Sequence, residues 1–340
     1  MSTPPTPQMP PQMPPQPAQQ QYPPHQQHLP PQQQYAAQQQ YAPPQGHPGQ
    51  PPAPSAQPAP GTAVPGAGRS HFGHALLSEW TKIRTVRSTM WTLVLMFVLT
   101  VGIGLLVAAA LSGEDYTGMP LLSSGLFGLM LGQLCIITLG VLVITSEYGT
   151  GMIRTTLTAC PHRGRVLLAK AVVFFLLSFT MTLAATALTA LFTSSLLSGQ
   201  TVPPEDWDDP VMKDSVENGE LVASSGHWLG ATVGAALYVA LLGLLGLAVG
   251  ALLRHSAGAI TTMVGLVLLP LVLALFMMVD SLSGLRDALI EYSPLNGLAS
   301  LYRLPFQGGT DTGWPLLGLL AAVTVAALVA AYAKLTATDV

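Results

Sequence analysis

The sequence predicts an all-α integral membrane protein with six transmembrane helices and cytoplasmic N- and C-termini. An interfacial elbow helix precedes the first span, and a disordered tail precedes the elbow. Three observations support this prediction: six apolar runs of bilayer length, basic residues gathered on one side of the membrane, and an abrupt change of composition near residue 68. The predicted units are a tail over 1–68, an elbow over 69–88 and a six-helix transmembrane domain over 89–340.

The first 68 residues contain no Asp, Glu, Lys or Arg, but they hold 21 of the 30 prolines and 17 glutamines. Such a segment has too little apolar surface to offset the entropy that ordering costs, and its prolines favour extended, solvated conformations. We therefore expect a disordered, cytoplasmic Pro/Gln-rich tail. Its role stays open, because a spacer, an inert tail and a docking segment with PxxP spacings all fit this composition.

The segment 69–88 predicts an amphipathic helix that lies in the membrane interface. Apolar side chains recur at helical spacing from Phe72 to Ile83, and Glu79 and Lys82 are assigned to the opposite, polar side. Two interpretations remain: a helix that only anchors the first span, or an elbow that also touches a cytoplasmic partner. The residues assigned to this elbow are Phe72, Leu76, Glu79, Trp80, Lys82, Ile83 and Arg84.

Six apolar runs follow, each about 20 residues or more, the length that an α-helix needs to cross a bilayer. Continuous runs indicate helices, because barrel strands would alternate polar and apolar residues. With the N-terminus inside, ten of the 13 basic residues fall on the cytoplasmic side, as the positive-inside rule requires. The runs are Met90–Leu111, Leu121–Thr145, Leu167–Leu197, Trp228–Leu253, Ala257–Val279 and Trp314–Ala333.

The two long loops on the outside differ in character. The loop 198–227 is acidic and rich in turn residues, so we expect a solvated cap with some helix. The loop 280–313 is too apolar for a plain aqueous loop, so part of it is expected to dip into the outer leaflet, sheltered by protein. Glycines at small-xxx-small spacing, such as Gly128 and Gly132, permit close approach between the spans.

The span cores, which in the third run cover Ala171–Leu191, contain no Asp, Glu, Lys, Arg or His. These are the side chains that mark proton relays and ion sites in membranes. The chain also has no GxxxxGK[ST] phosphate loop, no HExxH and no CxxC. His71 and His74 form an isolated i, i+3 pair, which favours interfacial polar residues over metal ligands. We therefore predict no catalytic residue, no metal site and no cofactor bound by this chain itself.

The cytoplasmic loop 146–170 is the densest polar segment on the inner side. A bare positive-inside loop needs basic residues alone, whereas a docking helix also needs an apolar stripe with charged flanks. Spacing leaves these two interpretations open. A bundle without an energy source of its own needs a partner to drive uphill transport. This loop is the segment where we expect such a partner to bind.

Three segments carry a resemblance to a known family. They are SEWTKIRTVRSTMW (Ser78–Trp91), SEYGTGMIRTTLTACPHRGRVLLAK (Ser146–Lys170) and YSPLNGLASL (Tyr292–Leu301). They resemble, in that order, the entry segment, the loop after the second span and the segment before the last span of type-2 ABC transporter permeases, particularly bacterial exporter subunits. The resemblance covers about residues 70–340, and the tail lies outside it.

This resemblance implies an exporter in the plasma membrane with two permease subunits, either two copies or a copy and a paralogue. It also implies a pair of separate ATP-binding subunits that carry ATP and Mg²⁺. Membrane lipids are the other expected partners, and no nucleic acid is expected. By this resemblance the residues near the ATPase contact would be Glu147, Tyr148, Arg154, Thr155, Arg163 and Lys170.

Two other functions stay open at this point. An ion-coupled secondary carrier would need an ionisable or carbonyl-lined site within the spans and would work without an ATPase. A non-transporting membrane scaffold or sensor would depend on the Pro/Gln-rich tail to recruit partners. The sequence does not reveal the cargo.

Overall fold

The computed structural model describes residues 72–152, 163–209, 211–212, 215–307 and 312–337. Within them, six helical segments of 21 to 34 residues are long and apolar enough to cross a membrane, which confirms the predicted six-span fold. The fourth of these joins α7 to α8 through one π-helical turn, η2 (Gly230–Gly234). The spanning helices are α3 (Arg87–Leu111), α4 (Ser124–Gly149), α6 (Arg163–Leu197), α7 (Ser225–Leu229) with α8 (Ala235–Leu253), α9 (Ser256–Phe276) and α12 (Trp314–Ala337).

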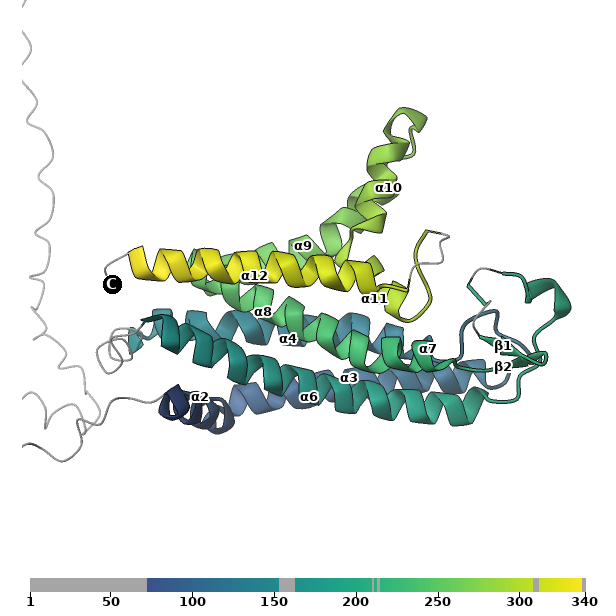
Figure 1. Cartoon of the computed structure of the whole chain (residues 1–340), viewed down its shortest axis with the longest axis horizontal. Helices are drawn as coiled ribbons and strands as arrows, with labels where there is room; N and C mark the ends of the chain where they lie inside the picture. Colours follow the sequence, from purple (N-terminus) through teal and green to yellow (C-terminus); the bar gives the residue numbers. More distant parts are fainter. Residues whose placement is uncertain (1–71, 153–162, 210, 213–214, 308–311, 338–340) are drawn as a thin grey trace, which may run out of the picture. The chain divides into compact units, whose positions relative to one another are not determined.

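The centre of the bundle is formed by α4 and α8. In their most apolar windows 56% and 72% of the residues are buried, against 17–28% for α3, α9 and α12. In Figure 1, α8 and α4 run between α12 and the pair α3 and α6, and these helices pack on one another. Glycines make the central contact possible: a Cβ on Gly140 of α4 would overlap the carbonyl oxygen of Gly243 of α8. A Cβ on Gly128, one of the predicted glycines, would likewise overlap the carbonyl oxygen of Thr100 of α3, which confirms the predicted role of small residues in close helix packing.

Replacing Gly140 by Val is expected to force α4 and α8 apart. Overpacking of a filled interior typically costs about 1–3 kcal/mol, so the apparent melting temperature of the purified protein should fall by several degrees. Gly102→Val is the matched control, because a Cβ on Gly102 of α3 would meet nothing within 4 Å. Equal melting temperatures for the two variants would contradict this packing.

Opposite ends of the bundle carry different structures. One end holds α2 (Phe72–Thr85) and the end of α12, and the other holds α7, α11 and a small hairpin (Figure 1). The hairpin pairs β1 (Val216–Glu217) with antiparallel β2 (Glu220–Leu221), after the short 3₁₀ turn η1 (Pro204–Asp206). The expected cap over 198–227 therefore contains strand as well as helix.

The apolar loop 280–313 is largely helical, with η3 (Asp280–Leu282), α10 (Ser283–Glu291) and α11 (Pro294–Leu301). From Leu295 to Leu301 every residue of α11 is buried. The N-terminus of α11 is capped: Ser293 accepts a hydrogen bond from the Asn296 N–H at 3.1 Å, and Pro294 occupies the first helical position. The expectation that protein shelters part of this loop is confirmed.

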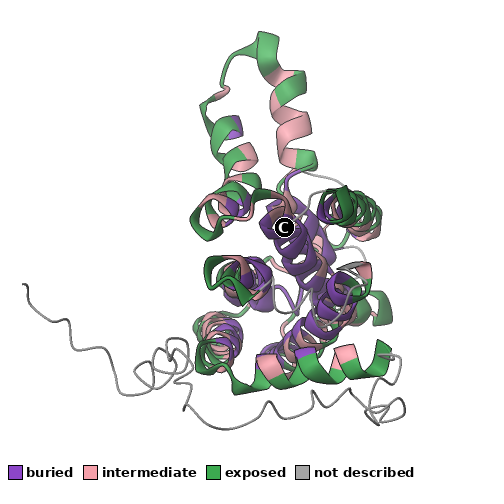
Figure 2. Ribbon diagram, turned by 90° about the vertical axis from the view of Figure 1, so that its left-hand side faces the viewer, coloured by how far each residue is buried: buried purple, intermediate pink, exposed green. Residues whose placement is uncertain are grey.

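The elbow helix α2 lies across the end of the bundle. Figure 2 views that end, with the long helices seen end on and α2 lengthwise along the bottom. Val86, in an extended conformation, separates α2 from α3. Helix α2 packs against α6 and α3, so one of its faces is covered by protein.

Candidate functional site

The candidate site is the place where α2 meets the ends of two spanning helices. Helix α4 continues past its apolar core to Gly149, which brings Glu147 into its last turn. Helix α6 begins at Arg163, and Lys170 lies two turns further along it. Both helices thus carry a charged side chain at the end of the bundle where α2 lies.

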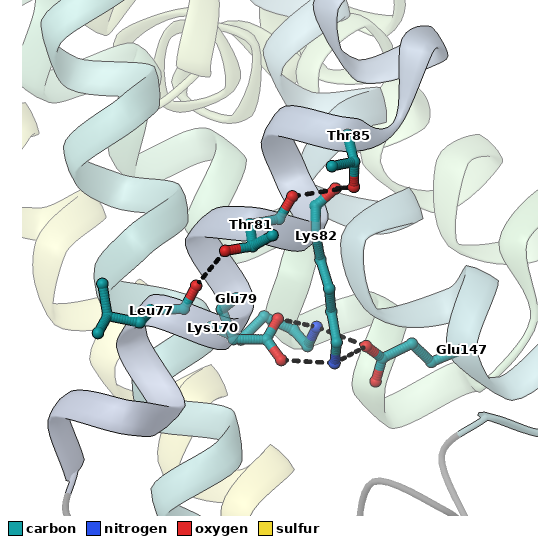
Figure 3. Close-up of polar contacts among 7 residues, drawn as sticks. All are labelled: Leu77, Glu79, Thr81, Lys82, Thr85, Glu147 and Lys170. Atoms are coloured by element: carbon teal, nitrogen blue, oxygen red, sulfur yellow. Dashed lines mark hydrogen bonds and ion pairs between the residues drawn. The ribbon is translucent and has the colours of Figure 1, made fainter.

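Four side chains from three helices form a closed ring of charges, here called the four-charge cluster: Glu79 and Lys82 of α2, Glu147 of α4 and Lys170 of α6 (Figure 3). Lys170 Nζ donates to Glu79 Oε2 at 2.6 Å and to Glu147 Oε1 at 2.9 Å. Lys82 Nζ donates to Glu79 Oε1 at 2.8 Å and to Glu147 Oε1 at 3.1 Å. Each lysine therefore bridges both carboxylates, and the formal charges of the cluster sum to zero.

The cluster is mostly buried. The side chain of Lys170 is 2% exposed, those of Glu79 and Glu147 are 5% and 8% exposed, and that of Lys82 is 33% exposed. Burying an ion costs several kcal/mol, and only good geometry with further hydrogen bonds repays this cost. The four short contacts supply good geometry for both lysines and for Glu79, so the cluster holds α2 in one position against α4 and α6.

The electrostatics of the cluster keep Glu79 and Lys82 charged at neutral pH. Burial raises the pKa of Glu79, but Lys170 and then Lys82 lower it by more, so it lies below its usual 4.5. Burial lowers the pKa of Lys82, but Glu79 and Glu147 outweigh burial and raise it from 10.5. The stabilising contribution of Glu79 is thus lost as pH falls through its folded-state pKa, and that of Lys82 as pH rises through its own.

A cavity of about 310 Å³ borders the cluster, between α2, α3 and α4. Thr89, Leu142 and Met152 contribute to its lining, together with all four members of the cluster. The Oε2 atom of Glu147 is buried and has no hydrogen-bond partner among the described residues. The surface that lines the cavity is mostly apolar, and the four charged side chains supply polar partners at one edge. Its volume has room for water, so Glu147 offers an acceptor to a water molecule at that edge.

The elbow residues separate into two faces. Glu79 and Ile83 are buried against the bundle and Leu76 is half-buried, whereas Phe72, Trp80 and Arg84 are exposed. The assignment of Glu79 to the polar face opposite Ile83 was therefore wrong. At about 100° per residue, Glu79 falls about 40° from the buried Ile83 around the helix axis, so it shares the protein-facing side.

The structure describes the side chains of three of the six residues predicted to touch an ATPase subunit: Glu147, Tyr148 and Lys170. Glu147 and Lys170 point inward and bond to α2, so they act as positioning residues rather than as exposed contacts. Tyr148 is half-buried, with the Arg254 guanidinium carbon 5.4 Å from its ring centroid. Arg154 and Thr155 lie outside the described residues, and so does the side chain of Arg163. The contact itself stays a prediction.

Comparison with known families agrees with this architecture. Residues 75–205 match the family model described as ABC-2 family transporter protein. The matched segment runs from α2 to the turn after α6, so it includes every member of the four-charge cluster. No curated protein matches the sequence.

The six apolar helices define the class of the chain as a multi-pass membrane protein. The family match over residues 75–205 supports the resemblance to type-2 ABC transporter permeases inferred from the sequence segments. Permeases of this family are membrane components of transport, and they work with an ATP-binding partner subunit.

Proposed function

We propose that this chain is the permease subunit of an ABC exporter and that a separate ATP-binding subunit docks on the 146–170 loop. A second permease, either a copy or a paralogue, completes the translocation pathway in the plasma membrane, where lipids surround both. The observation that carries the proposal is the four-charge cluster, because it bonds the elbow to both helices that border this loop.

The cluster supplies a route from the loop to the membrane-spanning core. A partner that pushes on the loop displaces the end of α4 and the start of α6 together. Through Glu79 and Lys82, α2 moves with them. Because α4 packs closely on α8 at Gly140, the displacement reaches the centre of the bundle. ATP and Mg²⁺ act on the partner. This chain converts the partner's motion into a switch of the translocation pathway between inward and outward access.

The distribution of charge supports cytoplasmic N- and C-termini. Ten of the 13 basic residues fall on the side of the elbow when the N-terminus is placed inside. The elbow, the end of α4 and the end of α12 all lie at this end of the bundle (Figure 1). An ATPase in the cytoplasm would therefore meet the elbow and the loop on the same side.

Purification of the tagged chain from its native membrane in mild detergent tests the proposal. We expect a soluble subunit with a phosphate-binding loop to copurify with the wild-type chain. The double variant Arg154→Glu, Arg163→Glu should lose it, because charge reversal removes the predicted contact. Arg286→Glu is the control, since Arg286 lies in α10 and pairs with Asp287. Absence of any ATPase, under conditions that preserve a known ABC complex, would contradict the proposal.

A further inference from the structure

A groove runs between α6 and α12 on the outer surface of the bundle. Its volume is about 720 Å³, within the range of small-molecule sites. Residues of α6 from Gly164 to Ala171 and of α12 from Val325 to Thr336 line it. Some of its α6 residues lie within the 146–170 segment, but neither the four-charge cluster nor the 310 Å³ cavity beside it forms part of this groove. The cluster therefore does not account for the groove.

The length of the groove along α12 is similar to the thickness of the hydrocarbon layer in one membrane leaflet. From Val325 to Thr336 a helix rises about 16 Å, and half of a bilayer's hydrocarbon core is about 15 Å. Leu168, Val325 and Val329 line it and are 55–61% exposed. An apolar channel of this length, open at the protein surface, fits an extended acyl chain.

The end of the groove nearest the start of α6 is positively charged. Arg165 lines it and is exposed, and no ion pair among the described residues includes Arg165. The first turn of α6 adds backbone N–H groups and the positive end of the helix dipole. The ring of Tyr332 lies directly over Gly164, where a Cβ would overlap it. Tyr332 thus borders this charged end, at the interfacial depth that tyrosine favours.

We propose that this groove binds an anionic phospholipid of the cytoplasmic leaflet, with one acyl chain between α6 and α12 and its phosphate at Arg165. Charge selects this occupant: the lining includes a basic side chain and no acidic one. A zwitterionic lipid would fill the apolar part equally well, so the headgroup contact with Arg165 sets the preference. One basic residue near the membrane surface gives roughly a fivefold preference for an anionic lipid.

Native mass spectrometry of the purified chain, titrated with phosphatidylglycerol or phosphatidylcholine of the same acyl chains, tests the proposal. We expect the wild type to retain phosphatidylglycerol about fivefold better. Arg165→Gln should abolish this preference while leaving apolar binding, whereas Val329→Trp should fill the groove and weaken binding of both lipids. Arg87→Gln and Val98→Trp are matched controls, because both residues are exposed on α3, outside the groove.

The outcomes separate the possible occupants. Millimolar inorganic phosphate should not displace the lipid; if it does, the site recognises a free anion and the proposal fails. It also fails if Arg165→Gln keeps the lipid preference, or if Val329→Trp changes the oligomeric state instead of lipid binding, since the groove would then be an interface between copies. Lipid binding needs no ATPase. Success or failure of the lipid experiment therefore does not affect the copurification experiment that tests the permease proposal.

Discussion

Replacing Lys170 by Met is expected to destabilise the protein by about 3–5 kcal/mol, the usual cost of breaking a buried ion pair by removing one partner. Met matches the length of the Lys stem but leaves Glu79 and Glu147 buried with Lys82 alone. The cluster then has a net negative charge at a site where Lys170 is 2% exposed. Thermal unfolding of the purified protein in detergent should show a fall in apparent melting temperature of roughly 10 °C.

Lys82→Met is the matched comparison, because Lys82 donates to the same two carboxylates. Its side chain is 33% exposed, so water can solvate the carboxylates that it leaves behind. We expect a clearly smaller loss of stability than for Lys170→Met. Similar losses of stability for the two variants would contradict the claim that the burial of each lysine determines how much it stabilises the protein.

Adding Glu79→Gln to Lys170→Met is expected to restore part of the lost stability, by about 1–3 kcal/mol. The double variant returns the cluster to zero net charge, with Lys82 and Glu147 still paired at 3.1 Å. Glu79→Gln alone should destabilise the protein, since it leaves Lys170 in excess. The four proteins form a double-mutant cycle whose melting temperatures measure the coupling between α2 and α6.

The cycle has a clear control. Asp280 lies in η3, outside the cluster, so Asp280→Asn added to Lys170→Met should restore nothing. Additive effects of Glu79→Gln and Lys170→Met would show that the two side chains act independently. The cluster would then be no link between the elbow and the spanning helices.

The spans themselves could be predicted from the sequence, because bilayer thickness fixes their length. Their ends could not. The predicted second span stops at Thr145 and the third starts at Leu167, whereas α4 continues to Gly149 and α6 starts at Arg163. Hydropathy identifies only the apolar part of a helix, which lies in the hydrocarbon core. The polar ends of α4 and α6 continue as helix beyond that part, because helical hydrogen bonds still pair their backbone groups.

The four-charge cluster was missed because its members are far apart in the sequence. Lys170 bonds to Glu79 across 91 positions and to Glu147 across 23, and no local pattern reveals such pairings. One signal was present: Glu79 lies four residues before Ile83, on the same helical face. A carboxylate on the buried side of a helix needs a cation, and Lys170, beside the apolar core of the third run, is a natural candidate.

The hairpin in the 198–227 loop had a local signal that the acidic composition obscured. Asn218 and Gly219 both adopt positive φ, 56° and 81°, and an Asn-Gly pair strongly indicates a two-residue hairpin turn. The paired strands are two residues long, too short for an alternating pattern to appear. Turn chemistry, rather than periodicity, was the informative feature.

Cross-linking from Cys160 tests the central claim most directly. Cys135→Ser leaves Cys160, in the 146–170 loop, as the single thiol of the chain. A benzophenone maleimide should label it from the cytoplasmic side of native membrane vesicles. On illumination the account predicts a cross-link to a subunit with a phosphate-binding loop. Labelling of Cys160 only from the outside, or a labelled Cys160 that captures no ATPase in vesicles with an active ABC complex, would contradict it.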